Sequence, residues 1–176
     1  MKAWPPPSNN SDASAPESPT PVTDPAFEDF FRANVTRMVR LGGLITGSQA
    51  VGEEIAQEAF SSVYARWSTL QEPAGYLRTI VVNRSRSHLR HEDVARRGDA
   101  KVGVKPDRVE DNYPNADRSV LDALDRLNER QRAAVVLKFW SDLPEKEIAT
   151  ILDCRPGTVK SMLSRALDDL RKVIAQ

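Results

Sequence analysis

Apolar residues recur at helical spacing from residue 24 onward, and they fall into two blocks. In the first block, Asp24 followed by Pro25 predicts a helix start, since an Asp cap and a first-turn proline both favour one. Thr46-Gly47-Ser48 predicts the end of this helix and the cap of a second, and Pro73 predicts a third. Three helices with short connections predict a compact bundle. Its apolar positions are Phe27, Phe30, Phe31, Met38, Leu41, Ile45, Ile55, Ala59, Phe60, Val63, Tyr64, Trp67, Tyr76, Leu77, Ile80 and Val81.

The second block, residues 119–176, predicts four more helices. Asn128 with Gln131 resembles a capping box, and Pro144 and Pro156 predict the starts of the last two helices. Between the blocks, residues 98–118 are rich in turn and loop formers, which predicts a linker. The fold class is therefore all-α, with two small helical domains at 26–97 and 119–176. The second block's apolar positions include Val120, Leu121, Leu124, Leu127, Ala134, Val135, Leu137, Phe139, Ile148, Leu152, Val159, Leu163, Ala166, Leu170 and Ile174.

Composition narrows the class of protein. Residues 1–25 hold seven of the twelve prolines, which predicts a disordered tail without the apolar core of a signal peptide. No apolar run is long enough to insert into a membrane, so we expect a cytoplasmic protein. Cys154 is the only cysteine, which excludes an internal disulfide. His88 and His91 lie three apart without a third ligand, so neither a metal nor a cofactor is expected.

The zero net charge hides a local separation of 25 basic and 25 acidic side chains. Residues 78–97 hold six arginines against Glu92 and Asp93, whereas the preceding predicted helix carries Glu53, Glu54 and Glu58. A protein that holds a polyanion on one side and a basic partner on the other needs such a pair of helices. Two oppositely charged, solvated faces explain the same pattern, and both interpretations stay open on charge alone.

Residues 144–168 have the shape of a helix-turn-helix, with small Ala149 where the two helices cross. Donors and short hydroxyls lie off the apolar stripe of the second helix, at the end that enters the major groove in such motifs. A helical hairpin of a protein core can carry similar basic residues, so the motif alone is a moderate signal. The candidate DNA-binding residues are Arg155, Thr158, Lys160, Ser161, Ser164 and Arg165.

Two sets of motifs resemble the extracytoplasmic-function (ECF) sigma factors of bacterial RNA polymerase, in the sigma-70 family. The runs Leu127-Asn128-Glu129-Arg130-Gln131-Arg132, Glu147-Ile148-Ala149, Gly157-Thr158-Val159-Lys160-Ser161 and Ser164-Arg165-Ala166 resemble region 4. Glu53-Glu54-Ile55-Ala56-Gln57-Glu58-Ala59-Phe60 resembles the region 2 motif that contacts the polymerase core. Pro73-Ala74-Gly75-Tyr76-Leu77, continuing to Arg90, resembles the part that reads the −10 promoter element. The two sets stand in the family's order, separated by its linker.

The resemblance implies a non-enzymatic specificity subunit that binds core polymerase, recognises the −10 and −35 elements and helps to open DNA. Its partners would be the polymerase β′ coiled coil, the β subunit and promoter DNA, and family members are often held by an anti-sigma factor. Region 4 would read the −35 element with the six residues of the helix-turn-helix. The implied core-polymerase residues are Glu53, Glu54, Gln57 and Phe60. The implied −10 residues are Tyr76, Asn83, Arg84, Arg86, Ser87, His88 and Arg90.

The chain departs from the family pattern at five positions: Val51, Ser87, Asp153, Arg155 and Met162. Three other functions compete with the sigma interpretation. A helix-turn-helix regulator that acts without polymerase leaves the acidic and basic helices of the first block unexplained. A small helical enzyme lacks paired carboxylates, a Cys/His arrangement or a Gly-rich phosphate loop at catalytic spacing. A pure interaction module gives the helix-turn-helix no role.

Overall fold

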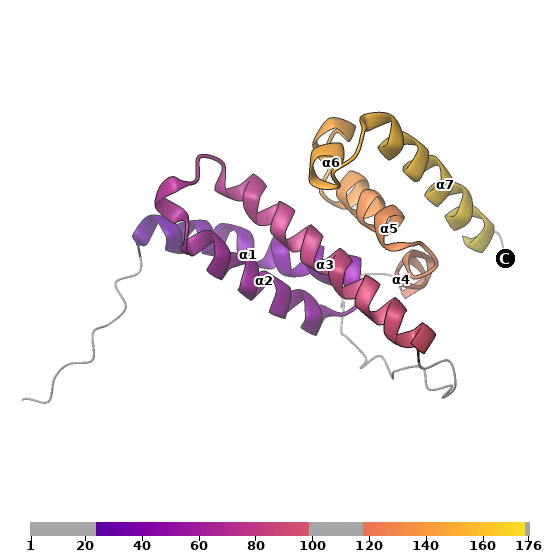
Figure 1. The fold of residues 1–176 in the computed structure, drawn as a ribbon, viewed down its shortest axis with the longest axis horizontal. Helices are drawn as coiled ribbons and strands as arrows, with labels where there is room; N and C mark the ends of the chain where they lie inside the picture. The colour runs from indigo at the N-terminus through magenta and orange to yellow at the C-terminus, as the bar shows by residue number, and fades with distance from the viewer. Residues whose placement is uncertain (1–23, 99–117, 175–176) are drawn as a thin grey trace, which may run out of the picture.

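The computed structural model describes residues 24–98 and 118–174, which form two groups of helices (Figure 1). The first group comprises α1 (Pro25–Thr46), α2 (Gln49–Tyr64), the short 3-10 helix η1 (Trp67–Thr69) and α3 (Pro73–Gly98). The second comprises α4 (Arg118–Leu124), α5 (Glu129–Val135), the π-helix η2 (Val136–Trp140), α6 (Glu145–Ile151) and α7 (Pro156–Ile174). The described residues contain no strand, and the all-α prediction is confirmed. The predicted tail and most of the predicted linker lie outside the described residues.

Local signals in the sequence place most of the helix ends. The Asp24 side chain accepts a hydrogen bond from the Ala26 N–H at 2.9 Å, and Ser48 caps α2 by accepting from the Val51 N–H. Gly47 ends α1 with φ of 84°, a left-handed conformation that glycine adopts without strain. At the start of α5, Asn128 and Gln131 form the predicted capping box.

Helices α1 and α2 cross at a contact between glycines. A Cβ atom on Gly52 would lie 2.5 Å from the Gly43 nitrogen and 2.6 Å from the Val39 carbonyl oxygen. Both neighbours are backbone atoms, which cannot move aside as a side chain could. Glycine at position 52 therefore fixes how closely the acidic helix α2 packs on α1.

Aromatic side chains close one end of the first group. Phe27 is buried between Tyr64 and Trp67, with ring centroids 4.8 and 5.2 Å away. Trp67 lies beyond α2, in η1, and its indole nitrogen donates to the Asp24 carboxylate at 3.1 Å. Tyr64 lies on the predicted apolar stripe but is 48% exposed, and its ring contacts that of Phe27.

The π-helix changes one predicted core position in the second group. Helix α5 continues directly into η2, where one extra residue per turn rotates the following side chains about the helix axis. Phe139, predicted to lie on the apolar stripe, is consequently 62% exposed, whereas Leu137 is fully buried. Val120, at the start of α4, is also exposed rather than buried.

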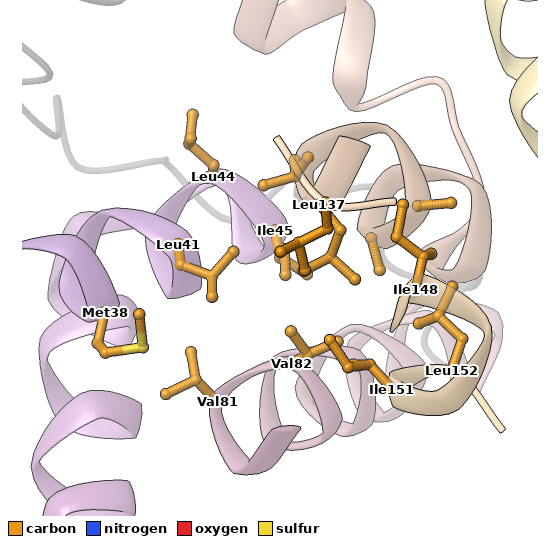
Figure 2. Close-up of a cluster of buried hydrophobic side chains, with 14 of the residues drawn as sticks. Met38, Leu41, Leu44, Ile45, Val81, Val82, Leu137, Ile148, Ile151 and Leu152 are labelled. Carbon is orange, nitrogen blue, oxygen red and sulfur yellow. The ribbon is translucent and has the colours of Figure 1, made fainter. Parts of the chain in front are cut away.

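The two groups share one hydrophobic core. Leu44 and Ile45 of α1 and Val82 of α3 belong to the same buried cluster as Ile148 and Ile151 of α6, together with Leu137 of η2. Figure 2 shows Val82 beside Ile151, and Ile45 pointing towards Leu137. Helix α3 also contacts α5 and α6, and α1 contacts α5 and η2. The sequence analysis predicted two domains joined by a linker and did not predict that they pack together.

Candidate nucleic-acid interface

The helix-turn-helix is built from α6, a four-residue turn and α7. Leu152 and Val159 are fully buried between the helices, and Ala149 is 3% exposed where they approach. The turn is a Schellman motif, in which the Cys154 N–H donates to the Ala149 carbonyl at 2.9 Å and the Asp153 N–H donates to Thr150. Asp153 has φ of 48°, the left-handed conformation expected where the family has glycine. Arg130 donates to the Leu152 carbonyl at 2.9 Å, which holds the turn against α5.

Helix α7 presents all of its predicted DNA-binding side chains to solvent. Val159, Leu163 and Ala166 face the core, so the residues between them point outward. The Ser161 hydroxyl donates to the Gly157 carbonyl at 3.0 Å and keeps a lone pair for a further contact. The exposed residues are Arg155, Thr158, Lys160, Ser161, Ser164 and Arg165. This face offers three cations and three hydroxyls, a set able to contact phosphates and base edges.

Helix α3 presents its predicted −10 residues in two directions. Leu77, Val81 and Val82 are buried and orient the helix. Asn83 and Arg84 are exposed, and the Arg84 guanidinium pairs with the Glu58 carboxylate of α2. Ser87 and His88 are half-buried, with the His88 Nε2 atom 3.5 Å from a Glu92 oxygen. Tyr76 is half-buried against the core, and the Arg66 guanidinium carbon lies 5.9 Å from its ring centroid.

The other direction on α3 faces the second group of helices. Arg86 is 8% exposed, and its Nη2 atom lies 3.4 Å from Oε1 of Glu129 on α5. Arg90 is more open but approaches the same oxygen, also at 3.4 Å. Two turns nearer the start of α3 than Arg86, Arg78 lies 3.6 Å from a Glu147 oxygen on α6. Sequence analysis missed the role of Glu129 and Glu147, because each resembles an ordinary solvated helix charge.

Helix α2 displays the predicted acidic face. Glu53, Glu54 and Gln57 are exposed, and the Gln49 amide donates to a Glu53 oxygen at 2.9 Å. Phe60, predicted to face the polymerase, is only 3% exposed and packs against Phe30 and Phe31. In this conformation the buried ring leaves almost no surface for a partner. Phe60 therefore supports the acidic face of α2 from within.

Within residues 24–98 and 118–174, no group of three His, Cys, Asp or Glu side chains is arranged to hold a metal ion. In the same two segments no helix is both long enough and apolar enough to cross a membrane.

The fold and these faces define a two-part helical protein that ends in a helix-turn-helix. A family model described as sigma-70, region 4, matches residues 117–170. An RNA polymerase sigma-E factor of Streptomyces coelicolor is 30% identical over 83% of this chain and 84% of its own length. The ECF RNA polymerase sigma factor SigM of Mycobacterium tuberculosis is 30% identical over 85% of this chain and 77% of its own length.

The chain therefore belongs to the ECF family of RNA polymerase sigma factors. This confirms the family resemblance and favours it over the regulator that acts without polymerase. The fold is similar to that of the sigma factor RpoE of Bartonella quintana, solved in complex with the anti-sigma factor NepR. That likeness has a TM-score of 0.70 at 19% identity and covers 85% of this chain and 97% of the other.

Proposed function

We propose that this chain directs RNA polymerase core to promoters through three helix faces. Exposed Glu53, Glu54 and Gln57 of α2 bind the β′ coiled coil, α3 contacts the −10 element and α7 contacts the −35 element. The chain acts as a specificity subunit and catalyses no reaction itself. Family membership supports the class of function. The observation that carries the DNA-binding part is the set of six exposed polar residues formed by Arg155, just before α7, and five residues on α7.

The three faces divide the work according to their chemistry. The acidic side chains of α2 suit a basic partner surface. On α7, Arg155, Lys160 and Arg165 supply salt-dependent affinity for phosphates, while the hydroxyls add contacts to base edges. On α3, arginines hold the backbone of the −10 strand, and captured bases offset an unstacking cost of a few kcal/mol without ATP.

Regulation by an anti-sigma factor is part of this proposal. The similar fold of RpoE was solved bound to the anti-sigma factor NepR, which supports a partner of that kind. Such a protein would cover the same exposed helix faces that polymerase and DNA require. We place the chain in the cytoplasm, together with polymerase.

Run-off transcription tests the proposed function. Purified chain and sigma-free polymerase core are mixed with genomic fragments of the source organism, and each component is also tested alone. We expect discrete transcripts that require both components. Binding of DNA fragments by the chain alone, without binding to core, would instead support a regulator that acts without polymerase.

A double variant locates the DNA-reading face within the same assay. Arg155→Ala with Lys160→Ala removes one cation just before α7 and one on it, and transcription should fall while binding to core is retained. Lys172→Ala is the matched control, since Lys172 lies near the end of α7 and pairs with Asp169 at 3.2 Å. If the double variant and the control transcribe equally well, α7 does not read the promoter.

A further inference from the structure

Aromatic rings form a surface at one end of the first half of the molecule, which comprises α1 to α3. Helices α1 and α2 pack side by side there (Figure 1). The Phe31 ring of α1 contacts Phe60 of α2 with centroids 4.7 Å apart, and Phe27 contacts Tyr64 at 4.8 Å. Phe27 and Phe60 are buried, whereas Phe31 is 38% and Tyr64 is 48% exposed. Each exposed ring follows a buried one by four residues, so the four rings form one patch across two helices, the Phe31–Tyr64 surface.

The acidic face of α2 continues from this surface. Gln57 precedes Tyr64 by seven residues and Glu53 precedes Gln57 by four, a spacing that places all three on one side of the helix. Glu58 lies on another side of α2, where it pairs with an arginine of α3. Among the described residues, no Lys or Arg pairs with Glu53. The exposed rings therefore border a carboxylate that a basic ligand would suit.

The first residues of the chain carry the chemistry that fits this surface. Trp4 is followed by three consecutive prolines, and Lys2 is the only charged side chain before Asp12. Proline-rich segments bind aromatic-lined surfaces, because the φ angle of each proline is already fixed and little entropy is lost. Tryptophan supplies a large apolar side chain, and the lysine complements the carboxylate of Glu53.

The length of chain before α1 allows the segment to reach this surface. Asp24 lies at the same end of the first half, where it accepts a hydrogen bond from the Trp67 indole at 3.1 Å. Residues 8–23 separate Pro7 from Asp24, and a chain of that length has an average span of about 23 Å. Phe31 lies seven residues further along α1, a rise of about 10 Å. The tether thus holds the segment near the rings at an effective concentration of about 1 mM.

We propose that residues 2–7 of this chain dock on the Phe31–Tyr64 surface, with Trp4 against the rings and Lys2 towards Glu53, and compete with polymerase core for α2. The competition rests on the proposed function of α2, whereas the docking does not. Core binds α2 only in molecules from which the segment has dissociated, so the apparent affinity for core is lowered by the docked fraction. A segment that docks with a Kd of about 0.5 mM occupies the surface in about two of three molecules.

Paramagnetic broadening in NMR spectra tests the docking on the full-length chain. A nitroxide is attached at Ala3→Cys, and Cys154→Ser in every protein removes the native thiol. We expect the backbone amide signals of Phe31 and Tyr64 to broaden, while the signal of Trp140 in the second half (α4 to α7) does not. A mixture of nitroxide-bearing chain with isotope-labelled chain that lacks the nitroxide shows whether the contact lies within one molecule.

Two pairs of variants identify the side chains that make the contact. Trp4→Ala should abolish the broadening, whereas Pro16→Ala, outside the docking segment, should retain it. Phe31→Ser should also abolish it, and Phe139→Ser is the matched control because Phe139 is an exposed phenylalanine of the second half. Thermal melting by circular dichroism verifies the fold of the two serine variants. Trp4 lies outside the helices of both halves, so Trp4→Ala decides the test even if Phe31→Ser does not fold.

Binding to polymerase core tests the competition. Fluorescence anisotropy measures the affinity of each dye-labelled chain for sigma-free core. We expect Trp4→Ala to bind core about threefold more tightly than the wild-type chain, as release of a segment docked in two of three molecules predicts. Pro16→Ala should match the wild-type chain.

Three results would overturn the docking: broadening that survives Trp4→Ala, broadening at Trp140 in place of Phe31 and Tyr64, and broadening only between molecules. The last result would identify a second copy of the chain as the partner. Equal affinity of Trp4→Ala and the wild-type chain for core would overturn the competition. If no protein binds core while the NMR signals behave as expected, the proposed sigma function fails and the docking stands.

Discussion

The two helices that we propose to contact DNA differ in how exposed their candidate residues are. The apolar side of α7 packs against the other helices of the second group, and all six candidate residues at this helix are exposed to solvent. Helix α3 belongs to the first group and also packs against the second, so Asn83 and Arg84 are exposed, with Arg84 paired to Glu58, whereas Arg86 is buried against Glu129. The exposure of a recognition surface is therefore set by how the halves pack as well as by the helix that carries it. Within one chain, the candidate residues of one helix can be exposed while a central residue of the other helix is buried.

The largest predicted effect tests whether the two groups of helices unfold in one cooperative transition. Gly52→Ala places a Cβ against the backbone of α1, and we expect the free energy of unfolding to fall by about 3 kcal/mol. Because both halves share one core, urea denaturation followed by circular dichroism should show a single transition at lower urea. Two separate transitions would show that the halves fold independently and that the shared core contributes little.

Gly75→Ala is the control for that substitution. A Cβ on Gly75 meets no atom within 4 Å, and the residue lies in the first turn of α3. Alanine lowers the entropy of the unfolded chain there, so stability should rise by about 0.5 kcal/mol. A loss as large as that of Gly52→Ala would mean that the glycine crossing is not the cause.

The next prediction tests the exposed candidate residues of α7. Arg165→Ala on α7 should weaken binding of holoenzyme to promoter DNA by about tenfold, since one charge-assisted contact contributes 1–3 kcal/mol. The slope of log affinity against log salt should fall by about 0.9 if the contact is to phosphate. Arg171→Ala, near the end of α7 and paired with Asp168 at 3.3 Å, is the control. Filter binding at several salt concentrations measures both quantities, and an unchanged affinity together with an unchanged slope would remove Arg165 from the interface.

Helix starts could be predicted from the sequence because their causes are local. An Asp before Pro25, a Ser before α2 and the Asn128–Gln131 pair each act within four residues of the helix they begin. The outward face of α7 was equally predictable, since the positions of Val159 and Leu163 fix where the polar residues point. The exposed half of the candidate site follows from one helix and its periodicity.

The covered half of the site could not be predicted in this way. Its contacts join residues far apart in sequence, such as Arg132 with Leu44, and depend on how two folded halves dock. Glu129 opens a helix, where an acidic residue is expected for the helix dipole alone, so nothing marks it as a partner of Arg86. One signal was present: Val82 is fully buried although it lies outside the predicted stripe of α3. A second apolar face on a helix indicates a second neighbour.

The caps of the two halves give a smaller test. Asn128 accepts from the Gln131 N–H at 2.9 Å and the Arg130 N–H at 3.1 Å, whereas Ser48 accepts one bond at 3.3 Å. Asn128→Ala should lower the free energy of unfolding by about 1 kcal/mol and Ser48→Ala by about half as much. Thermal melts followed by circular dichroism compare the two variants. A larger loss from Ser48→Ala would show that hydrogen-bond number and length do not rank these caps.

The last comparison concerns the residues that each group of helices uses in its left-handed turns. The first half uses Gly47 at φ of 84°, while the second uses Asp142 and Asp153 at φ of 52° and 48°. An aspartate tolerates this conformation at some cost, so Asp153→Gly should raise the free energy of unfolding by about 0.5 kcal/mol. Gly47→Ala, which removes the glycine from the left-handed position of the first group, should lower the free energy of unfolding by about 1 kcal/mol. Urea denaturation measures both changes. If Asp153→Gly is destabilising, the carboxylate stabilises the helix-turn-helix by more than its backbone strain costs, and its place in the turn is then an adaptation of this chain.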